Sequence, residues 1–227
     1  PLYLWHPILQ KHKTGMIPKL HYISQGSSPK EHLDNIQKAC SAGAELVQLR
    51  LKNVSEKKYL KLAEEAREIT SHFQTRLIIN SQYKIAKKVK ADGVHLEASD
   101  VCPIIARTHI YTWQIIGGTA NTMQDCEQLI NKQVDYISLS PFRLLVTQDN
   151  LPTVLGLNGY SAIIDALETE TPFIGAGGIT TTDVADILKT GVSGIGVSTD
   201  ITQDFDRIKT FNKLLSASST EEQRHTF

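Results

Sequence analysis

Short apolar runs alternate with longer amphipathic stretches from Lys19 onward, and this pattern predicts strands separated by helices. Eight runs predict strands: LHYISQ, ELVQLRLK, RLIINS, GVHLEA, QIIGGTA, YISLSP, PFIGAGG and SGIGVST. The stretches between them, such as EKKYLKLAEEAREITSHF and TTDVADILKTG, have helical patterns. Eight β-then-α units in succession favour an α/β fold with a parallel sheet, and eight is the number that closes a single (βα)8 TIM barrel.

The pattern shows no second domain. We expect an N-terminal extension over residues 1–18, one barrel domain over residues 19–216 and a polar C-terminal tail over residues 217–227 that frays. The extension has neither helical nor strand periodicity and contains Met16, a candidate start of the native chain. One long connection, over residues 141–158, stands out, because long loops on such scaffolds tend to be functional.

One predicted strand carries an unusual polar face. In ELVQLRLKN, residues 45–53, aliphatic side chains alternate with Gln48, Arg50 and Lys52. Inward side chains near the carboxyl ends of barrel strands line the active-site mouth, where two cations would form an anion site. The alternative is an outer strand whose charges are solvated.

Two glycine-containing strand ends predict a phosphate site. PFIGAGGIT places Gly175, Gly177 and Gly178 between a strand and a helix, and SGIGVSTDI brings Ser198 and Thr199 to the same kind of junction. The loops after the seventh and eighth strands of such barrels often bind phosphate, because glycines let backbone N–H groups approach closely. Turn geometry alone is the other explanation of these glycines.

Two further strand ends carry polar side chains with two interpretations each. Asp100 could hold Mg²⁺ near phosphate oxygens, or it could cap the helix after Pro103. Asn80 could hydrogen-bond a heteroaromatic edge, or it could be a turn residue. His95 lies inside a strand, where we expect a packed rather than a catalytic side chain.

Composition narrows the classes of partner. Lysine plus arginine and aspartate plus glutamate both number 24, so the formal net charge is zero and nothing global attracts nucleic acid or an anionic membrane. No apolar run approaches a membrane span, and no signal peptide is recognisable. Cys40, Cys102 and Cys126 lack paired spacing, so we expect reduced thiols in a cytoplasmic protein. The absence of a Gly-x-Ser-x-Gly elbow and a Walker loop leaves hydrolase and kinase readings without support.

The motifs QLRLK, LIIN, GVHLxxxD, IIGGTANT, DYISLSPF, FIGAGGIT and GIGVSTDI, in this order, resemble the thiamine phosphate synthase family and its thiazole tautomerase relatives. The resemblance runs from about Leu20 to about Ile201. It implies an enzyme that joins hydroxymethylpyrimidine pyrophosphate to thiazole phosphate with Mg²⁺. In the family, pyrophosphate leaves first and the thiazole nitrogen captures a pyrimidine carbocation, so electrostatic stabilisation of the leaving group should dominate.

The resemblance also implies roles for individual residues. We expect Arg50, Lys52 and Thr119 to serve catalysis and Asp100 to bind the metal; Thr119 stands where the family usually has Ser. The remaining substrate-binding residues are Gln48 and Asn80 for the pyrimidine pyrophosphate, and Thr147, Gly177, Gly178, Ser198 and Thr199 for the thiazole phosphate. The implied partners are small phosphorylated heterocycles, and a homodimer is expected because such barrels often pair.

Several positions depart from the family pattern. They are Ser81 for a second metal-binding Asp, Gln82 for Arg, Glu97-Ala98 for Gly-Gln, and Leu145-Val146-Thr147-Gln148 for Thr-x-Thr-Lys. One carboxylate and one ammonium are lost, which could leave ligand binding balanced while weakening transition-state stabilisation. Glu97 is a candidate replacement for the missing carboxylate.

These departures keep alternatives open beside a synthase of reduced activity. One is a catalytically impaired paralogue that binds a thiamine-related phosphate without turnover. A thiazole tautomerase is disfavoured, because Asn121 replaces that branch's histidine and cannot shuttle protons as histidine does. A phosphate-binding isomerase or epimerase would need a catalytic carboxylate or histidine pair, which the sequence does not reveal.

Overall fold

Eight parallel strands form a closed barrel in the computed structural model, which describes residues 17–143 and 153–224. The strands are β1 (Leu20–Ile23), β2 (Leu46–Leu49), β3 (Arg76–Asn80), β4 (Gly93–Leu96), β5 (Ile115–Ala120), β6 (Tyr136–Leu139), β7 (Phe173–Ala176) and β8 (Gly194–Val197). They follow one another in sequence order around the ring, and β1 closes it by pairing with β8, with Leu20 opposite Ile195. The predicted (βα)8 barrel is therefore confirmed.

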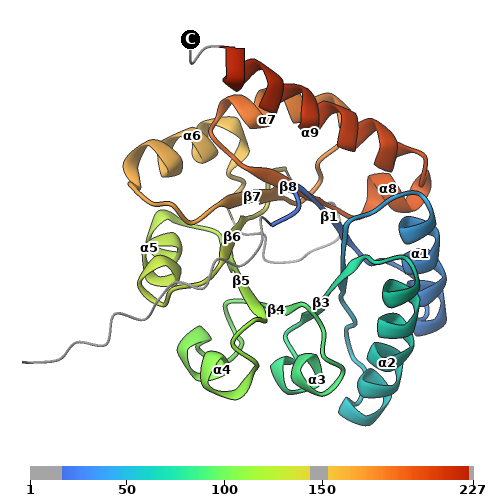
Figure 1. Cartoon of the computed structure of the whole chain (residues 1–227). Coiled ribbons are helices and arrows are strands. Elements are labelled where there is room, and N and C mark those ends of the chain that lie inside the picture. The colour runs from blue at the N-terminus through green and yellow to red at the C-terminus, as the bar shows by residue number, and fades with distance from the viewer. Residues whose placement is uncertain (1–16, 144–152, 225–227) are drawn as a thin grey trace, which may run out of the picture.

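Helices surround this ring of strands (Figure 1). They are α1 (Pro29–Ser41), α2 (Glu56–His72), α3 (Tyr83–Lys88), α4 (Pro103–His109), α5 (Met123–Asn131), α6 (Gly156–Ala166), α7 (Val184–Lys189), α8 (Thr199–Gln203) and α9 (Arg207–Arg224), with a 3-10 turn, η1 (Thr181–Asp183), before α7. Several begin with a side chain that accepts a backbone N–H, such as Ser28 for α1 and Ser55 for α2. None of the helices in the described ranges combines the length and the hydropathy needed to cross a membrane.

The core has two layers. The larger layer packs the outer faces of the strands against the helices, for example through Val47 and Leu49 of β2. The smaller layer consists of Leu46, Ile78, Ile115, Tyr136 and Ile174, which pack together inside the ring. Because strand side chains alternate, Leu46 and Gln48 share the inward face of β2.

Tyr136 occupies the barrel interior because β5 has a glycine beside it. A Cβ placed on Gly117 would lie 2.0 Å from the Cζ atom of Tyr136, so no larger residue fits there without moving the ring. The ring stacks on His95 with 5.5 Å between centroids and meets His21 edge to face at 5.1 Å. These three buried rings form the floor beneath the carboxyl ends of the strands.

Two tyrosines tie helices to the carboxyl ends of neighbouring strands. Tyr59 of α2 donates to the carbonyl oxygen atoms of Leu49 and Asn80, at 2.8 and 3.1 Å. Tyr160 of α6 donates to the carbonyl oxygen of Leu139 at 2.8 Å and accepts the backbone N–H of Ala176 at 3.1 Å. Both hydroxyls therefore join adjacent strands where the active-site end of the barrel begins.

The described residues reach into the expected C-terminal tail. The helix α9 continues to Arg224, into the segment 217–227 for which the sequence predicts a polar tail. Residues 144–152, in the middle of the long connection after β6, lie outside the described residues, as do residues 1–16 of the expected extension.

Candidate active site

A cavity of about 660 Å³ opens at the carboxyl ends of the strands. Its walls come from residues at or just after the ends of most strands, including Ile23 at the end of β1, Gln48 in β2, Glu97 after β4 and Gly177 after β7. This is the end of the barrel where enzymes of this fold place their active sites.

The β2 wall brings an amide and a guanidinium into the cavity. Gln48 is buried and Arg50, which follows the strand, is half-buried; both line the cavity. The backbone N–H of Arg50 donates to Ser24 Oγ at 3.0 Å, which fixes the chain just past the end of β2. Lys52 is exposed and is not among the lining residues, because β2 ends at Leu49 and the alternation does not continue into the loop.

Glu97 connects the ends of three strands. Its Oε1 accepts the side-chain N–H of Asn80 at 3.1 Å and lies 3.6 Å from Nε of Arg50. Asn80, the last residue of β3, also donates to Oε1 of Gln48 at 3.2 Å. Arg50 and Asn80 thus meet at the Glu97 carboxylate, and Gln48 joins them through its hydrogen bond with Asn80.

A second polar chain crosses the floor of the cavity. Nε2 of His95 lies 2.8 Å from Oγ1 of Thr119, and Nδ1 lies 2.9 Å from the hydroxyl of Tyr136. Thr119 also hydrogen-bonds to Glu97, which joins the two networks. The buried polar groups of the floor are therefore hydrogen-bonded before any substrate binds.

The network sets the protonation states at the cavity. Burial raises the pKa of Glu97, but the electrostatic interaction with His95, hydrogen bonds from Asn80 and Thr119, and the positive charge of Arg50 together lower it below its usual value. Burial, with a smaller contribution from Arg50, lowers the pKa of His95 against the opposing effects of Glu97 and Asp100. Near neutral pH the cavity thus presents an anionic Glu97 beside a neutral histidine.

Asp100 lies at the turn after β4 and does not cap the following helix. Its Oδ2 accepts the backbone N–H of Glu97 at 2.7 Å, whereas α4 has Cys102 at its N-cap position without a side-chain hydrogen bond. Asp100 is not among the residues that line the cavity. In the described ranges no three His, Cys, Asp or Glu side chains group together as a metal cage.

The β7 and β8 walls carry the predicted phosphate residues. Gly177 and Gly178 have positive φ angles of 93° and 79°, which favour glycine. Both line the cavity together with Ser198, between β8 and α8, and Thr199, the first residue of α8. Thr147, the other residue assigned to the thiazole phosphate, lies outside the described residues, as do Leu145 and Gln148.

Several cavity residues have no firm role from the sequence, and Glu97, Arg143 and His95 are among them. The sequence offers Glu97 only as a candidate replacement, gives no role to Arg143, and predicts that His95 is packed rather than catalytic. The strand pattern predicts which end of the barrel carries the cavity. It does not predict the partners of Glu97, because these come from β2, β3 and β5, and no local sequence pattern connects those strands. Only Arg143 gave a local signal, a cation directly after the SPF strand end.

A closed ring of eight parallel strands, with a polar cavity at their carboxyl ends, defines a (βα)8-barrel enzyme. The family model described as thiamine monophosphate synthase matches residues 20–201. The chain belongs to this family. The resemblance stated from the motifs is thus confirmed.

Relatives agree with the family assignment. The chain is 41% identical over 206 residues to a thiamine-phosphate synthase of Flavobacterium psychrophilum, covering 88% of this chain and all of the relative. It is 38% identical to a thiamine-phosphate synthase of Flavobacterium johnsoniae, covering 85% of this chain and 92% of that one. Both relatives carry the same name, so the family assignment makes the chain a transferase of thiamine biosynthesis. The impaired-paralogue and tautomerase alternatives are not favoured.

Solved structures share the fold. A thiamine phosphate pyrophosphorylase from Pyrococcus furiosus is similar with a TM-score of 0.75 at 23% identity, covering 88% of this chain and 96% of that one. A thiamine phosphate pyrophosphorylase from Bacteroides thetaiotaomicron gives a TM-score of 0.63 at 16% identity, covering 90% and 99%. At these identities the likeness supports the barrel architecture.

Proposed function

We propose that this chain is a thiamine phosphate synthase that joins hydroxymethylpyrimidine pyrophosphate to thiazole phosphate. In this reaction the bond between the pyrimidine methylene carbon and the pyrophosphate oxygen breaks, and the thiazole nitrogen forms a new bond to that carbon. The products are thiamine phosphate and pyrophosphate. The observation that carries the proposal is one cavity lined by Gln48 and Arg50 on one wall and by Gly177, Gly178 and Ser198 on another.

The β2 to β4 side of the cavity would hold the leaving group. Arg50 can donate to pyrophosphate oxygens as their negative charge develops, and Lys52 would have to reach in from its exposed position. Asn80 and Gln48 present amides that can pair with the pyrimidine edge. Because carbocation formation needs its leaving group neutralised more than it needs a base, these charges would supply most of the catalysis.

Residues near β4 fit a magnesium ion held mainly by substrate. Mg²⁺ is commonly bound through one or two carboxylates together with phosphate oxygens and water. Glu97 presents a carboxylate in the cavity and would take the place of the family ligand that is Ser81 here, whereas Asp100, in the same turn but outside the cavity lining, would have to reach in to supply a second. A bound Mg²⁺ would neutralise the pyrophosphate oxygens.

The other walls would hold the thiazole phosphate and the reacting centre. Backbone N–H groups near Gly177 and Gly178 can approach phosphate closely, and Ser198 and Thr199 add further donors. Thr119, whose hydroxyl is already directed into the His95 and Glu97 network, would lie beside the heterocycles. The phosphate groups of both substrates would thus be separated across the cavity while their rings meet between them.

The cellular setting belongs to the same proposal. The cysteines at Cys40, Cys102 and Cys126 are free thiols, which supports a cytoplasmic location. We also propose a homodimer, and the only basis for it is that barrels of this fold often pair.

A turnover assay tests the proposed function. Purified protein is incubated with both substrates and Mg²⁺, and thiamine phosphate and pyrophosphate are measured by chromatography. We expect equal amounts of both products, with none when either substrate is omitted and with strong dependence on Mg²⁺. Binding of both substrates without product formation would contradict the proposal and favour the impaired paralogue.

A further inference from the structure

The loop after β6 brings a second guanidinium to the cavity. Arg143 lines the cavity on the side of β6 and β7, away from the Arg50 wall. Among the described residues that line it, Arg50 and Arg143 are the ones with a permanent positive charge. Arg50 already contacts Glu97 at 3.6 Å. The two guanidinium groups therefore lie on different sides of the cavity, Arg50 near β2 to β4 and Arg143 near β6 and β7.

The backbone fixes Arg143 against the glycine loop after β7. The N–H of Phe142 donates to the carbonyl oxygen of Ala176 at 2.8 Å, and the N–H of Arg143 donates to that of Gly177 at 3.1 Å. A Cβ on Gly177 would lie 2.8 Å from Cα of Pro141, so the absence of a side chain allows the two loops to pack this closely. The position of Arg143 is thus set by the segment that contains the predicted phosphate residues.

The side chain of Arg143 is held from two directions. Its Nη2 donates to Oδ1 of Asp183 at 2.5 Å, and its guanidinium lies 5.2 Å from the centre of the Phe142 ring. Asp183 is itself fixed, because its Oδ2 accepts both the backbone N–H and the hydroxyl of Thr180 at 2.8 Å. A cation held in this way loses little freedom when a ligand binds.

The guanidinium nevertheless keeps capacity for a ligand. One N–H goes to Asp183, and an arginine has several others in a planar fork that matches phosphate. The Arg143 side chain is 45% exposed, whereas that of Asp183 is 13% exposed. Arg143 is therefore the member of this ion pair that a ligand can reach. Glycine N–H groups supply hydrogen bonds without net charge, and a phosphomonoester dianion entering the cavity needs a cation nearby.

We propose that Arg143 binds the phosphomonoester of the thiazole phosphate, acting with the Gly177–Gly178 loop. This inference deepens the proposed function and rests on it for the identity of the ligand. It assigns the phosphomonoester to Arg143 and the pyrophosphate to Arg50, so the two arginines distinguish the two substrates.

The test compares Arg143→Ala and Arg143→Lys with a matched control. Lys189→Ala removes one exposed positive charge, also paired with an aspartate, from α7 of the neighbouring unit and outside the cavity. Calorimetry measures binding of thiazole phosphate and of its dephosphorylated alcohol, and steady-state kinetics measure KM for each substrate separately. Urea unfolding verifies that all three variants remain folded.

We expect Arg143→Ala to weaken thiazole phosphate binding about ten- to hundredfold, the usual range for losing a charge-assisted hydrogen bond. Arg143→Lys should recover part of this loss, because it keeps the charge but not the fork. Binding of the alcohol, the KM for the pyrimidine pyrophosphate and every property of Lys189→Ala should stay within about twofold of the wild type.

Three results would overturn the inference: unchanged thiazole phosphate binding in Arg143→Ala, an equal loss for the alcohol, or a rise confined to the KM for the pyrimidine pyrophosphate. Calorimetry measures binding even when no product forms, so the inference and the proposed function are tested separately. If the wild type binds thiazole phosphate through Arg143 but forms no product, the proposed function fails while the role of Arg143 stands. If the wild type turns over and Arg143→Ala matches it, the inference alone fails.

Discussion

At the scale of single residues, the alternation along β2 explains which polar groups reach the cavity. Gln48 shares the inward face with the buried Leu46, and Arg50 lies next on that face just after the strand ends. Period-two reasoning placed both from sequence. The same reasoning also predicts Lys52 there, but Lys52 does not line the cavity, because Asn53, with a φ of 55°, belongs to a turn in which alternation no longer holds.

Removing Arg50 should weaken pyrophosphate binding while the fold survives. Arg50→Ala deletes the guanidinium of the β2 wall, and the half-buried residue contributes little to the core. We expect pyrophosphate affinity, measured by calorimetry with Mg²⁺ present, to fall about ten- to hundredfold. Lys61→Ala, at an exposed position of α2, is the control. Equal affinities in Arg50→Ala and the wild type would remove Arg50 from the site.

Neutralising Glu97 should have the opposite effect in the absence of metal. Its carboxylate lies 3.6 Å from Nε of Arg50 and competes with any anion for that charge. Because the pair is partly exposed, Glu97→Gln should tighten metal-free pyrophosphate binding by only about two- to fivefold. With Mg²⁺ present the gain should shrink or reverse, since one carboxylate ligand is lost.

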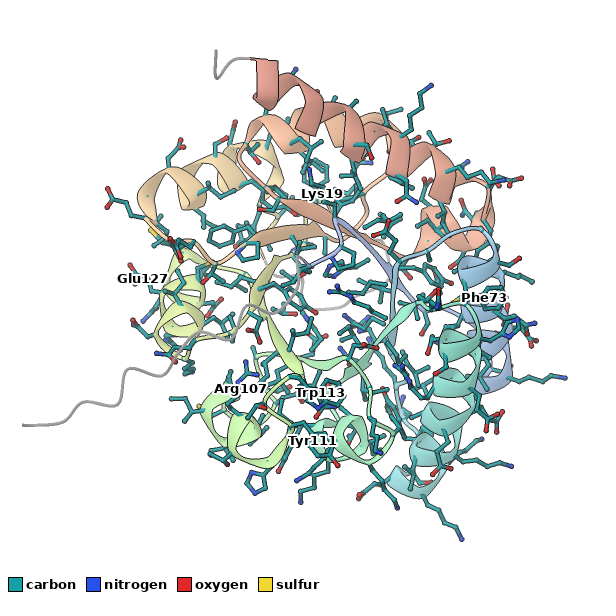
Figure 2. The ribbon with its side chains drawn as sticks, in the orientation of Figure 1. Lys19, Phe73, Arg107, Tyr111, Trp113 and Glu127 are labelled. Carbon is teal, nitrogen blue, oxygen red and sulfur yellow. The ribbon has the colours of Figure 1, made fainter. Side chains whose placement is uncertain are left out.

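The matched control for Glu97 is Glu127→Gln on α5, whose side chain lies on the outer helical layer (Figure 2). It removes the same charge without touching the cavity. Metal-free affinity that is unchanged or weaker in Glu97→Gln would show that Glu97 does not compete for Arg50.

At the scale of elements, the strand ends are held in place by tyrosines from the helix layer. Tyr160 reaches from α6 to the ends of β6 and β7, the strands that lead into the Arg143 and Gly177 loops. The sequence predicts this helix but not the tether, because α6 and the end of β7 meet only after the units are packed. Strands and helices follow from local periodicity, whereas contacts between units require the closed ring.

Losing this tether should cost stability. Tyr160→Phe keeps the buried ring but leaves the carbonyl oxygen of Leu139 and the N–H of Ala176 without a partner hydroxyl. We expect the free energy of unfolding, measured in urea, to fall by about 1 to 3 kcal/mol. Tyr111→Phe is the control, because Tyr111 lies outside the ring of strands and is 38% exposed (Figure 2). A Tyr160→Phe protein as stable as this control would contradict the tether.

At the scale of the whole molecule, the buried histidines should make stability depend on pH. Burial, with a smaller contribution from His95, lowers the pKa of His21 from 6.5 to about 3, and burial also lowers the pKa of His95. Below pH 6.5 these histidines become protonated in the unfolded chain but stay neutral in the folded barrel. The free energy of unfolding therefore falls with falling pH until the folded-state pKa is reached. Above pH 6.5 both states are neutral and these histidines add no dependence.

The slope can be measured between pH 6.5 and 5, above the range of the carboxylates. We expect His21 to lower the free energy of unfolding by about 1 kcal/mol per pH unit there, and His95 to add to this fall in the same direction. His21→Asn should give a shallower slope, because one of the two groups no longer titrates. A wild-type stability that stays constant over this range would show that the barrel interior accepts protons.

The architecture was predictable from sequence because each β/α unit carries its own periodicity, and eight of them close a ring. The cavity was predictable only in part. Gln48, Gly177 and Ser198 follow from their positions at strand ends, whereas the partners of Glu97 and Arg143 come from other units of the chain. Distances across a closed ring are set by its packing, and no local pattern encodes them.

The central claim is that one cavity holds pyrophosphate at Arg50, beside the turn that carries Asp100, and a phosphomonoester at the β7 and β8 loops. A crystal structure with thiamine phosphate, pyrophosphate and Mg²⁺ tests it most directly. We predict pyrophosphate within hydrogen-bonding distance of Arg50, the metal on Asp100, and the phosphate of thiamine phosphate against Gly177 and Gly178. Pyrophosphate bound on the outer helical layer, or beyond the reach of both Arg50 and Asp100, would contradict the claim.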